Sequence, residues 1–445
     1  SKPPGKLLML LTRPEKSWIL YDVANSAFVL IVTTTLMPIF FKSHAARGVD
    51  PDTATSWWGL TVSAASLAVA VSAPLIGTLA DYRGNKKKIM ILAIVSGMAA
   101  TLLCGAVRPG QWLLCLVLYG LARFGFATAN ICYDAFLTDV TTADRMDRIS
   151  ARGFGWGYIG SVVPFLLALA GLVLTRRLYQ TETFPAAGFM LAFFIAAAWW
   201  GLFSLPLLKN VRQVYFAPPA ARPVRDSFVT LYRTLSRIRR YRDVFLFLLA
   251  YFFYIDGVYT IISMAMAFGL DLKLSQGFLI GVILFIQVLA WPFAILFGNL
   301  AERFSARGMI LAGIGIYSLL TVTAFFLPVI NNSGLQVGLF YLMGFLIALA
   351  QGGIQSLSRS FFGKMIPPHR AAEFFGFYNI FGKFAAILGP ALMGVATLAT
   401  GSSRYGVLSI LSLFLIGGIL LTKVKPSDQD PARLRPSGPG RPGRP

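Results

Sequence analysis

The chain has 445 residues, of which 56% are hydrophobic and only 13% are charged, and its formal net charge is +22. Soluble domains carry about 25% charged residues, and a mean hydropathy of +0.68 is typical of membrane proteins. Composition therefore excludes an ordinary soluble domain, and with it the nucleic-acid binder that such a basic soluble chain would suggest.

Apolar segments long enough to cross a bilayer recur along the whole sequence. About 20 apolar residues in a helix span the roughly 30 Å hydrocarbon core, and a helix satisfies its own backbone hydrogen bonds there. The first segment follows a basic leader without a clear cleavage site, so we do not interpret it as a signal peptide. We predict an all-α membrane protein with twelve transmembrane helices, in chain order 17–41, 57–80, 88–108, 111–139, 153–175, 186–208, 244–270, 276–300, 308–329, 335–362, 373–398 and 403–422.

The positive charges are unevenly distributed between the loops. If the N-terminus is cytoplasmic, 30 of the 40 Lys and Arg residues fall in cytoplasmic segments, seven fall on the other side, and three lie within spans. Cytoplasmic loops of membrane proteins are enriched in Lys and Arg. The distribution predicts an even number of spans and both termini in the cytoplasm. We expect a multi-pass monomer in the lipid bilayer of a bacterial inner membrane.

The longest polar interruption divides the chain into two halves of six spans each. It is rich in arginine and proline. We predict an N-terminal six-helix bundle at 1–208, a cytoplasmic basic linker at 209–243, a C-terminal six-helix bundle at 244–424 and a disordered tail at 425–445. Two pseudo-symmetric halves are a common construction of secondary transporters.

A short motif occurs after the second span and again, in weaker form, after the eighth. Both copies combine a Gly, a Leu-Ala pair, an acid and a base. The Gly permits close helix approach, and the acid can cap a neighbouring helix N-terminus and pair with a base. A merely charged turn is the alternative. We predict a latch that joins the halves on the cytoplasmic face, made of Gly77, Asp81, Arg83 and Gly84 with Glu302 and Arg303.

These residues carry a family resemblance. The first copy of the motif resembles the conserved loop motif of the major facilitator superfamily, which implies two six-helix bundles. The segments Tyr21–Phe28, Gln351–Ser360 and Glu373–Pro390 resemble the vacuole-effluxer-type branch, although that branch usually has Trp where this chain has Val23. The branch includes fungal vacuolar exporters linked to recycling of amino acids after autophagy. The resemblance implies solute transport more firmly than it implies a substrate.

Six charged residues fall within the predicted spans, where each costs a few kcal/mol if it faces lipid. The resemblance implies that the first, fourth, seventh and tenth helices line a central cavity, and five of the six lie on those helices. Pairs such as Asp22 with Arg123 and Asp256 with Lys383 would reduce the cost. Hydrogen bonding between helices is the alternative for the uncharged residues. The predicted substrate and proton cavity consists of Asp22, Asn25, Arg123, Asn130, Asp134, Asp256, Tyr259, Gln351, Gln355, Arg359, Asn379 and Lys383.

No pattern typical of an enzyme or a metal site is present in the sequence. Cys104, Cys115 and Cys132 lie within spans, and the two histidines lie in loops on opposite sides of the membrane. There is no phosphate-binding glycine loop and no nucleophile elbow. We expect no cofactor and no catalytic activity.

The predicted function is secondary active transport by alternating access. Cationic groups within the spans suit an anionic or zwitterionic solute such as an amino acid, a short peptide or an organic anion. We expect proton coupling through Asp22, Asp134 or Asp256, with Asp22 and Asp256 ranked first. The alternatives are a lipid or lysolipid flippase or exporter of the same fold, and a drug/proton antiporter.

Overall fold

The computed structural model describes residues 11–181, 183–218, 223–236, 241–271 and 274–425. Within these ranges the chain is almost entirely helical, and an isolated bridge joins Tyr82 to Ala217. The predicted tail lies outside the described residues except for Lys425.

The N-terminal half contains the first six spans. The first is a continuous run of α1 (Arg13–Phe28), η1 (Val29–Leu36), α2 (Met37–Phe40) and η2 (Phe41–Ala45). It begins with a capping box, because Thr12 and Glu15 satisfy each other's backbone N–H groups. The other five are α3 (Pro51–Asp81), α4 (Asn85–Gly105), α5 (Trp112–Val140), α6 (Met146–Leu178) and α7 (Ala186–Asn210).

The C-terminal half follows a linker that contains α8 (Pro223–Ser236). Its spans are α9 (Arg242–Asp271), α10 (Gln276–Phe304), α11 (Ala306–Phe326) with η4 (Leu327–Val329), α12 (Ser333–Met365), α13 (Ala371–Thr400) preceded by η5 (Pro368–Arg370), and the pair α14 (Ser403–Ser409) and α15 (Leu411–Thr422). Eleven helices in the described ranges are long and apolar enough to cross a membrane, and α13 adds a shorter apolar stretch at Leu388–Thr400. The twelve predicted spans all correspond to helices.

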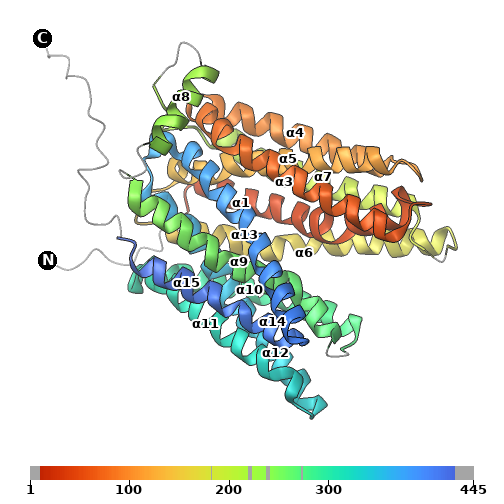
Figure 1. Cartoon of the computed structure of the whole chain (residues 1–445). Coiled ribbons are helices and arrows are strands. Elements are labelled where there is room, and N and C mark those ends of the chain that lie inside the picture. Colours follow the sequence, from red (N-terminus) through yellow and green to blue (C-terminus); the bar gives the residue numbers. More distant parts are fainter. Residues whose placement is uncertain (1–10, 182, 219–222, 237–240, 272–273, 426–445) are drawn as a thin grey trace, which may run out of the picture.

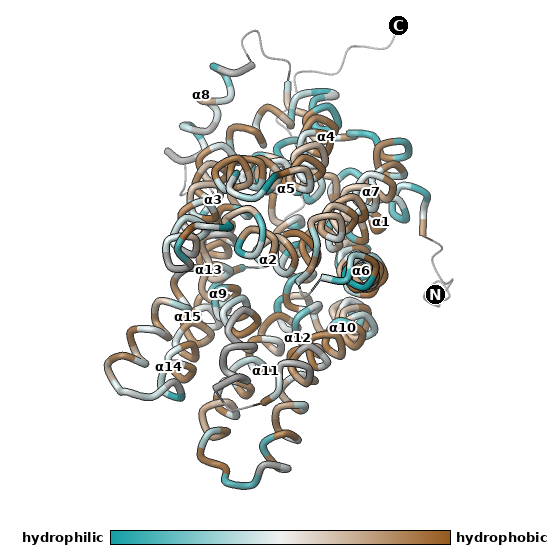
Figure 2. The backbone as a smooth tube through the Cα atoms, turned by 90° about the vertical axis from the view of Figure 1, so that its right-hand side faces the viewer, coloured by the Kyte–Doolittle hydropathy of each residue, from teal (hydrophilic) through white to brown (hydrophobic). Residues whose placement is uncertain are grey.

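The two halves meet along two seams, where α3 packs against α13 and α6 packs against α10 (Figure 2). Glycine makes both seams close. A Cβ atom on Gly77 would lie 2.2 Å from the carbonyl oxygen of Ala372, and one on Gly298 would lie 2.3 Å from the Cβ of Ala151. Gly77 and Gly298 occupy equivalent places in the repeated motif, so the pseudo-symmetry of the sequence extends to the packing.

The halves are joined at one end and diverge at the other (Figure 1). We call the joined end the linker side, because α8 and both described chain ends lie there, and the opposite end the far side. The ion pairs that connect the halves, described below, also lie toward the linker side. The structure therefore shows one state, closed on the linker side.

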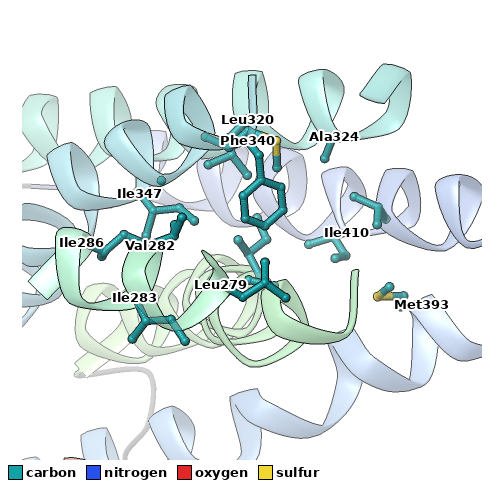
Figure 3. A pocket seen from close by; sticks show the side chains of 15 residues that line it. Leu279, Val282, Ile283, Ile286, Leu320, Ala324, Phe340, Ile347, Met393 and Ile410 are labelled. Atoms are coloured by element: carbon teal, nitrogen blue, oxygen red, sulfur yellow. The ribbon is translucent and has the colours of Figure 1, made fainter. Parts of the chain in front are cut away.

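An apolar pocket lies within the C-terminal half (Figure 3), with about 670 Å³ of empty space when open solvent at its mouth is included. Its lining comes from α9 to α14 and includes Leu279, Phe340 and Ile410. None of the polar residues predicted to line a cavity borders it. The predicted central cavity thus stays a prediction.

Three local features of the structure were not predicted from the sequence. The outer part of the first span is π-helical at Val29–Leu36 and Phe41–Ala45, a geometry that is rare and often functional. The last span is interrupted at Ile410. The linker, predicted only as a basic segment, contains the 14-residue helix α8.

Candidate functional site

Arg359 of α12 connects the two halves in the interior of the protein. Its Nη2 donates to Asp22 Oδ2 of α1 at 3.0 Å, and its Nη1 lies 3.5 Å from Asp134 Oδ1 of α5. Its Nε donates to Ser150 Oγ of α6 at 2.9 Å. The Arg359 side chain is only 3% exposed. One cation of the C-terminal half is therefore held by three helices of the N-terminal half, and we call Asp22, Asp134, Ser150 and Arg359 the Arg359 cluster.

Aromatic rings surround the guanidinium group. Its carbon lies 4.3 Å from the ring centroid of Phe154 and 4.6 Å from that of Trp18, distances at which cation–π attraction operates. Trp18 itself is fixed by a 2.9 Å hydrogen bond from Nε1 to the carbonyl of Tyr133. A Cβ on Gly153 would lie 2.2 Å from Asp22 Oδ2. The position requires glycine because the Asp22 carboxylate fills that space.

Predicted amides extend the cluster. Asn379 Nδ2 donates to Asp134 Oδ2 at 3.3 Å, and Asn25 Nδ2 donates to Asn130 Oδ1 at 3.1 Å. Gln355 accepts from the hydroxyl of Tyr158 at 3.2 Å. Gln351 is buried on the preceding turn of α12, and Tyr259 is part-exposed on α9.

A second group of contacts joins α6 to α12 and α10, nearer the linker side. Asp147 accepts from Lys364 Nζ and from Ser360 Oγ, each at 2.6 Å, and Arg148 forms an ion pair with Glu302. Sequence reasoning missed Asp147, Ser150 and Lys364. A signal existed, because Ser356, Ser360 and Lys364 repeat every four residues and continue the polar face of Arg359.

The latch motif lies at the seam between α3 and α13. Asp81 accepts the backbone N–H groups of Ala372 and Glu373, each at 2.9 Å, and so caps the N-terminus of a helix from the other half. Gly84 directly precedes α4 with a φ of +77° and donates its N–H to Gln213 at 2.9 Å. The remaining latch residues differ: Arg83 covers Phe216 at 5.3 Å, Glu302 pairs with Arg148, and Arg303 is exposed on the last turn of α10.

The pair of Asp22 with Arg123 suggested from the sequence is wrong, whereas the pair of Asp256 with Lys383 stays a prediction. Asp22 pairs with Arg359, whereas Arg123 is part-exposed and contacts the hydroxyl of Tyr119 at 3.3 Å. Asp256 is buried and binds the backbone N–H of Gly389 through both carboxylate oxygens at 3.0 Å. Helix α13 contains Pro390 directly after Gly389, and a proline disturbs the preceding turn. The side chain of Lys383 is not among those that the structure describes.

His369 lies next to the latch, between the spans α12 and α13. Partial burial and the neighbouring Arg370 lower the pKa of its imidazole below the ordinary value. Arg370 in turn donates to Glu373 Oε2 at 2.8 Å. Protonation of His369 would therefore place a second positive charge beside the first turn of α13.

Comparison with known proteins gives the family. Residues 13–429 match the family described as "Vacuole effluxer Atg22 like". The chain belongs to this family. It is 45% identical to the uncharacterised MFS-type transporter YxiO of Bacillus subtilis (strain 168), covering 94% of this chain and 96% of that protein. It is 26% identical to autophagy-related protein 22 of Coccidioides immitis (strain RS), covering 83% and 73%.

Solved structures give the fold. The transporter FucP in the outward conformation matches with a TM-score of 0.68 at 13% identity, over 93% of this chain and 98% of that one. The proton:xylose symporter XylE matches with a TM-score of 0.69 at 11% identity, over 92% and 95%. The protein is a multi-pass member of the major facilitator superfamily and a transporter rather than an enzyme. The predicted fold class and family are confirmed.

Proposed function

We propose that the chain is a proton-coupled secondary transporter that moves a small solute with an anionic group by alternating access. The charge distribution of the loops supports a cytoplasmic linker side. The described state is then the one in which the halves are joined on the cytoplasmic side.

The Arg359 cluster is the observation that carries the proposal. Its guanidinium binds two carboxylates across the boundary between the halves, 3.0 Å and 3.5 Å away. When the halves separate on the linker side, three buried charges lose their partners, and breaking a buried pair is strongly unfavourable. Opening of this side therefore requires that the charges be compensated in another way, either by a proton on a carboxylate or by a bound solute.

Protonation of a carboxylate is one way to release Arg359. A proton on Asp22 or Asp134 removes the negative charge opposite the guanidinium, so the halves can separate at lower cost. Asp256 suits this role less, because its carboxylate holds the backbone of α13 within the C-terminal half. We therefore rank Asp22 and Asp134 as the coupling acids, a change from the ranking based on the sequence.

Arg123 is the candidate contact for the solute. It shares one face of α5 with Asp134 but lies 11 residues, about 16 Å, further toward the far side. It is part-exposed, and no carboxylate among the described residues forms an ion pair with it. An unpaired guanidinium favours a carboxylate or phosphate group. An amino acid, a short peptide or an organic anion fits this requirement.

Transport measured in proteoliposomes tests the proposal. A panel of labelled amino acids, peptides and organic anions is offered with and without an imposed pH gradient. Arg123→Gln should abolish uptake of the anionic solute, whereas Arg108→Gln, which removes an exposed charge in a far-side loop, should leave it unchanged. Asp22→Asn should remove the response to the pH gradient but preserve solute exchange. Full gradient-driven transport in both Asp22→Asn and Asp134→Asn would contradict the coupling role.

A further inference from the structure

The outward surface of α8 is unusual for a polar linker. Three of its exposed side chains are apolar or aromatic: Phe228 is 56% exposed, Val229 38% and Tyr232 73%. Arg225 and Arg233, both exposed, lie beside them. At 100° per residue these five positions share one face of the helix, and we call them the outer face of α8.

On the opposite side of α8, two small polar residues are directed at the protein. Ser227 is fully buried and Thr234 is 1% exposed. Thr234 Oγ donates to Glu373 Oε1 at 2.6 Å, and Arg370 contacts the same hydroxyl. Ser227 and Thr234 thus turn polar groups inward, while the outer face exposes apolar side chains.

The linker holds α8 at the level of the span ends. The backbone N–H of Ala217 donates to the carbonyl of Asp81, the last residue of α3, at 2.8 Å. Asp139, near the end of α5, accepts from the N–H groups of Val214 and Tyr215. The other end of α8 is fixed at the first turn of α13 through Thr234. Figures 1 and 2 show α8 at the edge of the bundle beyond α3, so its outer face lies where lipid headgroups surround the protein.

We propose that the outer face of α8 binds the linker-side leaflet of the membrane and prefers anionic phospholipid. Aromatic side chains are favoured at the membrane interface, and arginine there contacts anionic headgroups while its stem stays in apolar surroundings. An interfacial helix combines these features. Binding of α8 then supports the closed linker side, because Thr234 connects the helix to Glu373, whose N–H group is held by Asp81.

Electron paramagnetic resonance on the full-length chain tests the surface. A nitroxide on Tyr232→Cys is examined in nanodiscs of phosphatidylcholine, with and without about 30% phosphatidylglycerol. Cys104, Cys115 and Cys132 are buried. We expect oxygen accessibility to rise and aqueous nickel accessibility to fall at least threefold with phosphatidylglycerol. Equal accessibility in both lipids would overturn the proposal.

Charge variants separate a specific contact from general attraction. Arg225→Gln with Arg233→Gln should abolish the lipid effect. Lys209→Gln with Arg212→Gln removes the same charge from exposed positions at the end of α7 and just after it, and should retain the effect. If the first double variant is not monodisperse, each single variant serves in its place. An equal loss in the two double variants would mean that α8 is not the binding surface.

Hydrogen exchange tests the connection to the latch. Amides of the first turn of α13, including Ala372 and Glu373, should exchange several-fold more slowly with phosphatidylglycerol present. Thr234→Val keeps the shape of the side chain and removes its hydroxyl, so it should cancel this slowing while the label at position 232 still reports membrane contact. Slowing that persists in Thr234→Val would refute the connection.

Discussion

Replacement of Asp22 by Asn tests whether the Arg359 cluster holds the linker side closed. The Arg359 Nη2 to Asp22 Oδ2 contact is 3.0 Å long and buried. A hydrogen bond to a charged group contributes about 1.5–3 kcal/mol. Asn keeps an acceptor oxygen and Asp134 remains nearby, so we take the lower value. About 1.5 kcal/mol shifts the equilibrium between closed and open states roughly tenfold toward the open state.

Double electron–electron resonance measures this shift. Nitroxides on Ala143→Cys and Thr422→Cys, both exposed on the linker side, report the separation of the halves. Asp22→Asn should enlarge the long-distance population, and Asp134→Asn should do so less because its contact is 3.5 Å. Lys86→Gln is the matched control, since its buried pair with Asp139 at 2.7 Å lies within one half and the contacts of Asp139 with the linker backbone remain. An unchanged distribution in monodisperse Asp22→Asn, or an equal change in the control, would refute the reasoning.

Three further predictions follow from the geometry. Gly77→Ala should favour the open state in the same distance measurement, because its Cβ would meet backbone at 2.2 Å, whereas Gly59→Ala on the same helix meets open space and should have no effect. The lowered pKa of His369 means that stability is lost as the pH falls below about 6.5; His369→Gln should reduce the fall in Tm between pH 7.5 and 5.5, and an identical fall would exclude this group. Asp256→Ala removes the carboxylate that accepts from the N–H of Gly389, and a hydrogen bond to a charged group contributes about 1.5–3 kcal/mol, so Tm should fall while the response to a pH gradient remains. Loss of that response at unchanged Tm would restore Asp256 as a coupling acid.

The helices and their division into halves could be predicted because bilayer thickness imposes a length on every span. Helix α8 could not be recognised in the same way, since its Arg-rich composition resembles a solvated linker. Its outer face does repeat at helical spacing, as Phe228 and Tyr232 are four residues apart. Only the structure shows that this face points away from the protein.

The partner of Asp22 could have been found by counting depth along the helices. At 1.5 Å per residue, Asp134 and Arg359 each lie six residues, about 9 Å, from the linker-side ends of α5 and α12. Asp22 lies nine residues from the start of α1, about 14 Å. Arg123 is 17 residues from the end of α5, about 25 Å, and therefore too far along the membrane normal to meet Asp22. Helical periodicity predicts that all these residues face the interior, but their distance from the linker-side helix ends determines which of them touch.

The two copies of the latch motif hold their seams with different strength. Asp81 is 1% exposed and caps α13 with two backbone hydrogen bonds, whereas the equivalent Glu302 forms a part-exposed pair with Arg148. Exposed pairs contribute about 0–1 kcal/mol, so the motif itself holds the α6–α10 seam weakly. The contact of Asp147 on α6 with Lys364 on α12, and that of Arg359 on α12 with Ser150 on α6, stabilise this side instead. Asp81 binds two backbone N–H groups that the helix α13 fixes in place, whereas Asp147 binds the side chains of Ser360 and Lys364, which can rotate away. We therefore expect separation to begin at the α6–α10 seam, and a distance label pair across that seam should respond to Asp147→Asn before a pair across α3 and α13 does.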